Sequence, residues 1–286
     1  MSKLRIVYVH GIHGKPAEEV YRAEWDAAVR RLTYVREIQS AMMYWSDIRL
    51  GLTAADVAQA HALARRRGEH RFGRLRPQTN SPLGYAISLF LHAVDPVIRR
   101  ITTELLTEVY LYFYGRSGAQ DIRDAILDRM GAMMREVRPQ VVIAHSWGSV
   151  IAYDYLLNRA YQGELDGLIT CGSPLGQDYV QEHIGTKAYP SQVRHWLNVF
   201  DAMDPATWPD RRISNDLRGP RGEHLIRDVE IPSVYDEGGK RDPHSWYGYL
   251  MSEPVQAELF RIAASDTLWG DETPQMPPDR QLETGS

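Results

Sequence analysis

The sequence predicts an α/β fold, in which a mostly parallel central sheet is flanked by helices. The first observation is a set of short apolar runs, rich in β-branched residues and bounded by turn residues: Leu4–Val9, Val141–Ala144, Leu168–Cys171 and His195–Phe200. Runs that are apolar throughout are typical of strands buried on both faces of a parallel sheet. The second observation is that helical periodicity separates these runs. Alternating strands and helices favour a doubly wound sheet with right-handed crossovers.

The clearest helical spacing lies in Asp121–Val137. Its apolar residues fall on one face of a helix and are Ile122, Ile126, Met130, Met133 and Val137. Pro139 predicts the end of this helix, because the residue before a proline is driven out of the helical conformation. Two further strands are expected, at Ala41–Trp45 and at Leu225–Ile231.

Composition limits the classes of function. The net charge of −4 gives no global basic field, so no nucleic acid partner is expected. The single cysteine, Cys171, excludes an intrachain disulfide. The apolar stretch that begins at Leu4 is too short for the core of a signal peptide, and no run reaches the roughly 18 apolar residues of a membrane span. We therefore expect a cytoplasmic protein.

Two segments depart from a minimal α/β unit. Residues 46–118 are too long for a simple connection, and they contain a predicted helix at Ala54–Arg67 and an apolar helical stretch from Leu83 to Tyr114. We interpret 46–118 as a helical, lid-like insert within a domain that spans residues 1–272. Residues 273–286 are polar and proline-rich without periodicity, which predicts a disordered tail.

The residues that say most about chemistry surround Ser146. The buried strand Val141–Ala144 leads into this serine, and a helical pattern begins directly after it. A serine on such a sharp strand-to-helix turn has its hydroxyl exposed above the sheet, in a nucleophile elbow. The turn needs small residues two positions before and after the serine, and Ala144 and Gly148 meet this need. The alternative is a serine that only caps the helix.

With these residues around Ser146, the chain resembles the α/β-hydrolase superfamily, in particular its compact lipase- and esterase-like members. The resemblance covers residues 4–14 and most of 121–250. It is carried by the segments Val-His-Gly-Ile-His-Gly at 9–14, Ala-His-Ser-Trp-Gly-Ser at 144–149 and Cys-Gly-Ser-Pro-Leu-Gly at 171–176. The common pattern has glycine where this chain has Ala144. The resemblance implies an α/β-hydrolase fold and a serine hydrolase without a metal or cofactor.

The resemblance also implies an oxyanion hole. In relatives with a His-Gly turn after the first strand, the next residue supplies one N–H donor, which corresponds to Ile12; the residue after the nucleophile, Trp147, supplies the other. His10 is expected to support this loop, whereas His13 and His145 are candidates for binding substrate. His10 and His13 do not have the helical spacing of a metal-binding pair, and no carboxylate cluster completes a site. No metal is therefore expected.

A serine nucleophile needs a histidine base and a carboxylate that orients it, and on this fold they follow in the order serine, acid, histidine. Asp204 and Asp201 both follow the strand His195–Phe200, and either can also simply start a turn. We favour Asp204, because Asp204-Pro205 resembles the Asp-Pro at which many family members place the acid. His244 follows the strand Leu225–Ile231, where the family keeps its base.

The expected function is the cleavage of carboxylic esters, including lipid acyl esters, through an acyl-enzyme. Aromatic and aliphatic residues of the insert suit acyl chains, or they form the core of the insert itself. Six arginines between Arg65 and Arg76 suit an anionic headgroup, or they form a solvated basic face. A transient contact of the insert with a membrane surface would go with the lipid interpretation.

Two other classes of function stay open at this stage. The same three residues would serve an amidase, a thioesterase or an acyltransferase. A non-catalytic binding protein with the hydrolase fold is the second class. The sequence leaves the oligomeric state unknown.

Overall fold

A computed structural model describes most of the chain outside the insert and the C-terminal tail. The described residues are 3–12, 16–31, 37–45, 62, 110–117, 120–159, 161–185, 187–207, 210–232 and 234–268. His13, the predicted helix Ala54–Arg67 apart from Ala62, the arginine cluster and residues 273–286 lie outside them. The predictions of a helical lid and of a disordered tail therefore stay predictions.

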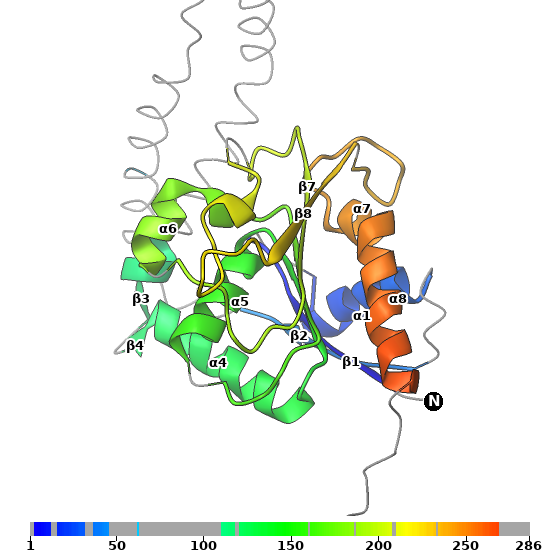
Figure 1. The fold of residues 1–286 in the computed structure, drawn as a ribbon, viewed down its shortest axis with the longest axis horizontal. Helices are drawn as coiled ribbons and strands as arrows, with labels where there is room; N and C mark the ends of the chain where they lie inside the picture. Colours follow the sequence, from blue (N-terminus) through cyan, green and yellow to red (C-terminus); the bar gives the residue numbers. More distant parts are fainter. Residues whose placement is uncertain are drawn as a thin grey trace, which may run out of the picture.

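Within the described residues, six parallel strands form one sheet in the order β2-β1-β5-β6-β7-β8 (Figure 1). They are β1 (Leu4–Val9), β2 (Ile38–Met43), β5 (Val141–His145), β6 (Gly167–Cys171), β7 (Trp196–Asp201) and β8 (Ile226–Ile231). A small antiparallel pair joins β3 (Arg116–Ser117) to β4 (Gln120–Asp121). The predicted α/β class with a parallel sheet is confirmed.

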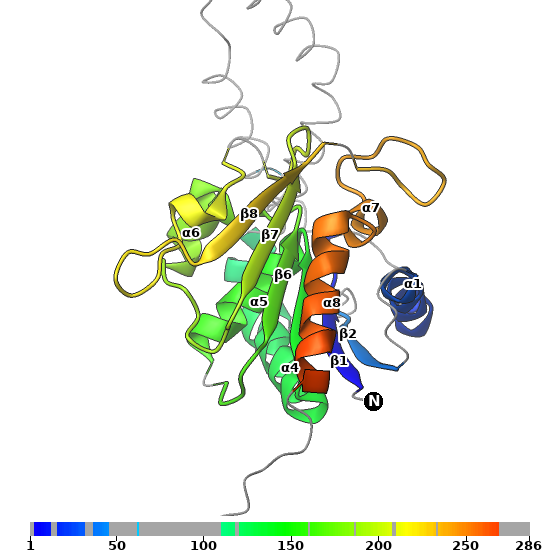
Figure 2. The same ribbon diagram turned by 45° about the vertical axis from the view of Figure 1, so that its right-hand side comes forward.

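Helices cover both faces of this sheet. They are α1 (Glu18–Arg30), α4 (Ile122–Val137), α5 (Trp147–Asn158), α6 (Asp178–Ile184), α7 (Trp246–Leu250) and α8 (Glu253–Leu268), with the short 3-10 helices η2 (Pro174–Gly176) and η3 (Ile213–Asn215). Figure 2 shows α4, α5 and α6 on one side of the sheet and α1 and α8 on the other.

The central strands are mostly apolar because each face of the sheet packs on its own hydrophobic core. In β1, Val7 and Val9 belong to the core under α4 and α5, whereas Ile6 and Tyr8 belong to the core under α1 and α8. The strand β5 alternates in the same way and is buried along its whole length. This double burial is the physical reason why the strands could be predicted from continuous apolar runs.

The structure shifts some predicted boundaries. The strand β2 begins at Ile38 rather than Ala41, and its first residues are only partly buried because it is an edge strand. The helix α4 ends as expected before Pro139, with Arg138 in the left-handed conformation (φ 47°). On this helix Met134 is fully buried, and Met133 packs at the margin of the core.

The C-terminal end of the insert is anchored to the core. Residues 110–114 are helical, and the Tyr112 hydroxyl donates to Asp154 Oδ2 at 2.6 Å. Arg123 donates to both oxygens of the same fully buried carboxylate, at 2.6 and 2.7 Å. Since this charge is fully paired, its burial is tolerated. The Tyr112 ring also packs edge-on against Trp147, next to the predicted nucleophile.

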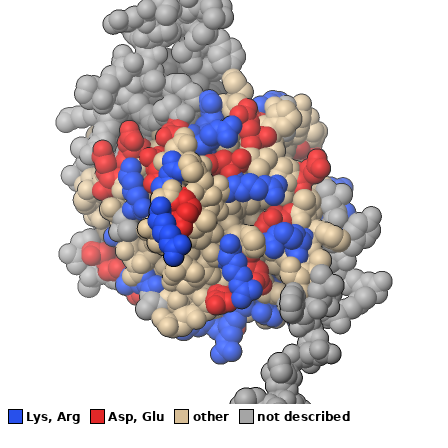
Figure 3. Space-filling view, viewed as in Figure 1, with Lys and Arg blue, Asp and Glu red and all other residues tan. Residues whose placement is uncertain are grey.

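Among the described residues, no helix is both long and apolar enough to cross a membrane. On the face seen in Figure 3, acidic and basic side chains are interspersed.

Candidate active site

The candidate site lies where the chain reverses its direction of winding. The strands β1 and β5 are neighbours in the sheet, but the chain leaves β1 through α1 on one face and β5 through α5 on the other. In open α/β sheets, ligands bind in the crevice that forms at the carboxyl ends of the strands at this switch point. Gly11 and Ile12 follow β1 there, and Ser146 follows β5.

Ser146 forms the strained turn expected for a nucleophile elbow. Its φ of 55° and ψ of −130° are unusual for a residue with a side chain. Its N–H donates to the Cys171 carbonyl at 2.9 Å, which ties the turn to the end of β6. Ser149 donates to the Ser146 carbonyl at 2.6 Å. The neighbouring elements thus hold the strained conformation in place.

The loop after β1 passes directly against this elbow. A Cβ atom on Gly148 would lie 2.3 Å from the Val9 carbonyl oxygen and 2.6 Å from that of His10. A Cβ on Gly11 would lie 2.7 Å from the Ser146 Cβ. Glycine is required at both positions because the two backbones approach too closely for a side chain.

We expect Gly148→Ala to destabilise the protein by about 2–3 kcal/mol, although alanine normally stabilises a helix relative to glycine. The added methyl group would meet backbone atoms, which cannot move aside as a flexible side chain can. The matched control is Gly131→Ala in α4, where the nearest atoms belong to the side chains of Arg135 and Tyr155 at 3.2 and 3.3 Å. Urea denaturation measures both; equal stabilities of the two variants would contradict the close approach at Gly148.

His10 braces the loop after β1, as expected from the sequence. Its Nε2 accepts from the Trp45 backbone N–H at 3.3 Å, so Nδ1 carries the proton and donates to the Gly11 carbonyl at 2.6 Å. The Trp45 indole N–H donates to the His10 carbonyl at 3.0 Å, and the two rings stack with an interplanar angle of 6°. His10 and Trp45, which follows β2, therefore hold the loop that contains Gly11 and Ile12.

The structure brings Ser146, His244 and Asp204 together from the ends of three strands. His244 Nε2 lies 2.9 Å from Ser146 Oγ, and His244 Nδ1 lies 2.9 Å from both oxygens of Asp204. Because an ionised carboxylate can only accept, Nδ1 carries the ring proton and Nε2 is left to accept one from the serine. This arrangement allows the imidazole to remove the serine proton.

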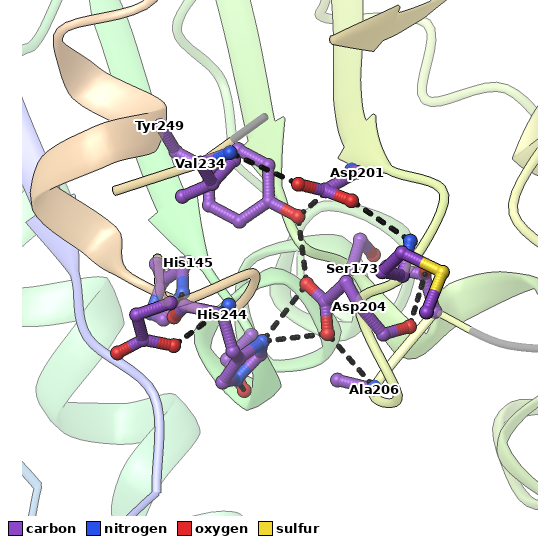
Figure 4. A network of polar contacts seen from close by, with 12 residues as sticks. His145, Ser173, Asp201, Asp204, Ala206, Val234, His244 and Tyr249 are labelled. Atoms are coloured by element: carbon purple, nitrogen blue, oxygen red, sulfur yellow. Dashed lines mark hydrogen bonds and ion pairs between the residues drawn. The ribbon is translucent and has the colours of Figure 1, made fainter. Parts of the chain in front are cut away.

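Asp204 is fully buried and its carboxylate is held by donors on each oxygen. The Ala206 N–H donates to Oδ1 at 2.8 Å, and the Tyr249 hydroxyl donates to Oδ2 at 2.7 Å. Figure 4 shows Asp204 between Tyr249 and His244. These donors compensate the removal of the carboxylate from water.

Asp201, the alternative acid, faces a different partner. Its carboxylate forms an ion pair with Arg241 at 2.5 Å and accepts from the backbone N–H groups of Val234 at 3.0 Å and Met203 at 2.8 Å. Asp201 is the last residue of β7 and Asp204 lies in the turn beyond it. The structure therefore places Asp204 against His244, and Asp201 holds the loop that leads to His244.

The two expected oxyanion donors come from neighbouring elements. Trp147 is the first residue of α5, where backbone N–H groups have no acceptor within the helix and the helix dipole is positive. Ile12 is buried in the loop that packs on Ser146. Trp147 thus directly follows the serine, and Ile12 lies in the loop after β1, at the carboxyl ends of the two strands that form the switch point.

His145 lies beside His244. It is buried, its Nε2 lies 3.0 Å from the His244 carbonyl oxygen, and its ring centroid lies 4.7 Å from that of His244. These contacts suit a residue that positions His244, whereas the sequence suggested substrate binding. His13, the other candidate for substrate binding, lies outside the described residues.

Two contacts of this site were not predicted. Tyr249 contacts the acid, and Arg241 fixes the loop through Asp201. The only signal in the sequence was the position of both residues close to His244, on a charged loop and in an aromatic segment. Neither residue type marks such a role by itself.

Among the described residues, no cluster of three or more histidine, cysteine or acidic side chains could hold a metal ion. Comparison of the sequence with protein-family models and with curated proteins finds no match.

Proposed function

We propose that the protein is a serine hydrolase that cleaves carboxylic esters through an acyl-enzyme, with Ser146 as nucleophile, His244 as base and Asp204 as the acid that orients the base. The observation that carries the proposal is the position of one imidazole, 2.9 Å from Ser146 Oγ through Nε2 and 2.9 Å from Asp204 through Nδ1. The strained conformation of Ser146 and the N-terminus of α5 support it.

In the proposed reaction, Ser146 Oγ attacks the ester carbonyl carbon while His244 Nε2 takes the hydroxyl proton. The backbone N–H groups of Ile12 and Trp147 donate to the negative oxygen that forms. The carbon–oxygen bond to the alcohol then breaks, and the imidazolium returns its proton to the leaving alcohol. Water hydrolyses the acyl-enzyme by the same steps, with His244 again as base.

The order of the three residues supports assignment to the α/β-hydrolase fold within the observed α/β class. Ser146, Asp204 and His244 follow β5, β7 and β8, which is the order serine, acid, histidine of that fold. We include two further points in this proposal. Residues 46–118 form a lid over this site, and lipid acyl esters are among the substrates.

The pH dependence of ester hydrolysis tests the proposal. An imidazolium cannot accept the serine proton, so kcat/KM should fall about tenfold per pH unit below the range near pH 6.5 in which histidine side chains ordinarily titrate. A chromogenic short-chain ester, corrected for spontaneous hydrolysis, measures this. A rate that stays constant between about pH 5 and pH 8 would contradict a histidine base.

The same assay ranks the leaving groups. An ester, a thioester and an amide with one common acyl group can be compared on the same enzyme. Preference for the ester is the expected result, and preference for the thioester or the amide would move the function to those classes of acyl transfer.

A further inference from the structure

A tyrosine hydroxyl connects Asp201, the last residue of β7, to Asp204 in the turn beyond it (Figure 4). Tyr249 donates to Asp204 Oδ2 at 2.7 Å, and its oxygen accepts from the Asp201 backbone N–H at 3.0 Å. We propose that Tyr249 is a positioning residue of the active site, whose hydroxyl orients the Asp204 carboxylate and moderates its attraction for the His244 proton. The catalytic part of this inference rests on the proposed function.

The contacts of Asp204 explain why one hydroxyl has this effect. Among the described residues, each carboxylate oxygen has one donor besides His244: the Ala206 N–H for Oδ1 and the Tyr249 hydroxyl for Oδ2. Together they fix the plane of the carboxylate, and His244 Nδ1 approaches both oxygens at 2.9 Å. Without the tyrosine hydroxyl, the imidazole would be the one donor left to Oδ2 within the described part of the chain.

Tyr249 is itself rigid and can donate in only one direction. Its side chain is fully buried on α7, five residues after His244. Because its oxygen accepts from the Asp201 N–H, its single proton is directed at Asp204. Tyr249 therefore links Asp204 to the backbone of Asp201. The Asp201 side chain in turn pairs with Arg241, which lies in the loop before His244.

Burial and the neighbouring charge of Asp204 keep this hydroxyl protonated. Burial, followed by the negative charge of Asp204, raises the pKa of Tyr249 well above its ordinary value. The other titratable or charged groups that face it are Asp201, Cys171, Arg241 and His145. Tyr249 consequently remains a donor throughout the pH range in which the histidine base changes its charge.

The expected consequence is electrostatic. The hydrogen bond from Tyr249 withdraws part of the Asp204 charge from His244. In Tyr249→Phe more of that charge acts on the imidazole, which stabilises the imidazolium. His244 should then titrate at higher pH than in the wild-type protein.

NMR titration of the His244 ring in wild type and Tyr249→Phe tests this directly, with the signal assigned from a His244→Gln variant. We expect the midpoint to move upward by about half a pH unit. We expect kcat to fall about tenfold and KM to change less than about twofold, because the tyrosine acts on the base and not on bound substrate.

The matched control is Tyr153→Phe. The Tyr153 hydroxyl is also part of a buried residue with two hydrogen bonds, one to the Ala188 carbonyl at 2.8 Å and one from the Ala188 N–H at 3.1 Å. This variant should lose a similar amount of stability with no change in the His244 midpoint or in kcat. An unchanged midpoint and kcat in Tyr249→Phe would overturn the inference.

Should Tyr249→Phe fail to fold, 3-fluorotyrosine at position 249 keeps the hydroxyl and makes it a stronger donor. The His244 midpoint should then move to lower pH; no movement, or movement upward, would overturn the inference. The NMR readout needs no turnover. If the midpoints shift as expected but wild-type Ser146 is inert, the positioning contact stands and the proposed hydrolase function fails.

Discussion

Ser146→Ala is expected to reduce ester hydrolysis by a factor of about 10⁵ or more, to the level left by binding and the oxyanion donors alone. The variant removes the atom that attacks the carbonyl carbon and leaves His244 and Asp204 in place. The fold should persist, because the Ser146 hydroxyl contacts His244 and its backbone bonds to Cys171 and Ser149 do not involve the side chain.

Steady-state kinetics and thermal unfolding of the same preparation measure both effects. Ser265→Ala is the control, since this hydroxyl donates to the Arg261 carbonyl at 2.9 Å on α8, outside the site. The control should keep wild-type activity. Retention of more than about 1% of the activity in Ser146→Ala would remove Ser146 as nucleophile.

Asp204→Asn is expected to lower kcat by about 10⁴-fold. An asparagine at this position can donate to His244 Nδ1, which favours the ring tautomer with the proton on Nε2. In that tautomer Nε2 cannot accept the proton of Ser146, although every distance in the site stays similar. The fluorescence or circular dichroism spectrum should remain that of the wild type.

Asp201→Asn provides the contrast, because Asp201 is equally buried and lies three residues earlier. It should cost about 2 kcal/mol of stability through the weakened pair with Arg241, and it should lower kcat by less than about tenfold. Rates of both variants at one pH decide between the two aspartates. The reverse ranking, with Asp204→Asn nearly silent, would make Asp201 the acid.

The fold class could be predicted because a strand that is buried on both faces of a sheet appears in the sequence as a continuous apolar run. The strands β1, β5 and β6 consist mostly of apolar residues, and their packing on two cores shows why. The edge strand β2 is polar in its first half, so its start was placed three residues late. Helix α8 was not predicted, although the spacing of Val255, Leu259 and Ile262 carried its signal.

The elbow was predictable for a local reason. A strand, a serine, a small residue and a helix follow one another within a few positions, and the strain of the turn follows from that order. The distinction between Asp201 and Asp204 is not local. Asp201 ends β7 and Asp204 lies three residues later, and which of them meets His244 depends on how the loop before His244 folds back. In the structure that loop carries Arg241, which pairs with Asp201.

Tyr249 illustrates the limit more sharply. Its distance of five residues from His244 was visible, but the partner of a tyrosine hydroxyl depends on the orientation of α7 against β7. Such an orientation is set by packing between distant segments and has no pattern in the local sequence. The structure was needed to find this contact.

The most direct test of the central claim is the intact mass of wild type and Ser146→Ala after treatment with a fluorophosphonate, which reacts covalently with activated serines. The account predicts one adduct on the wild type, on Ser146, and none on the variant. No adduct on folded wild-type protein, with and without detergent, or an equal adduct on both proteins, would contradict the assignment of Ser146 as an activated nucleophile.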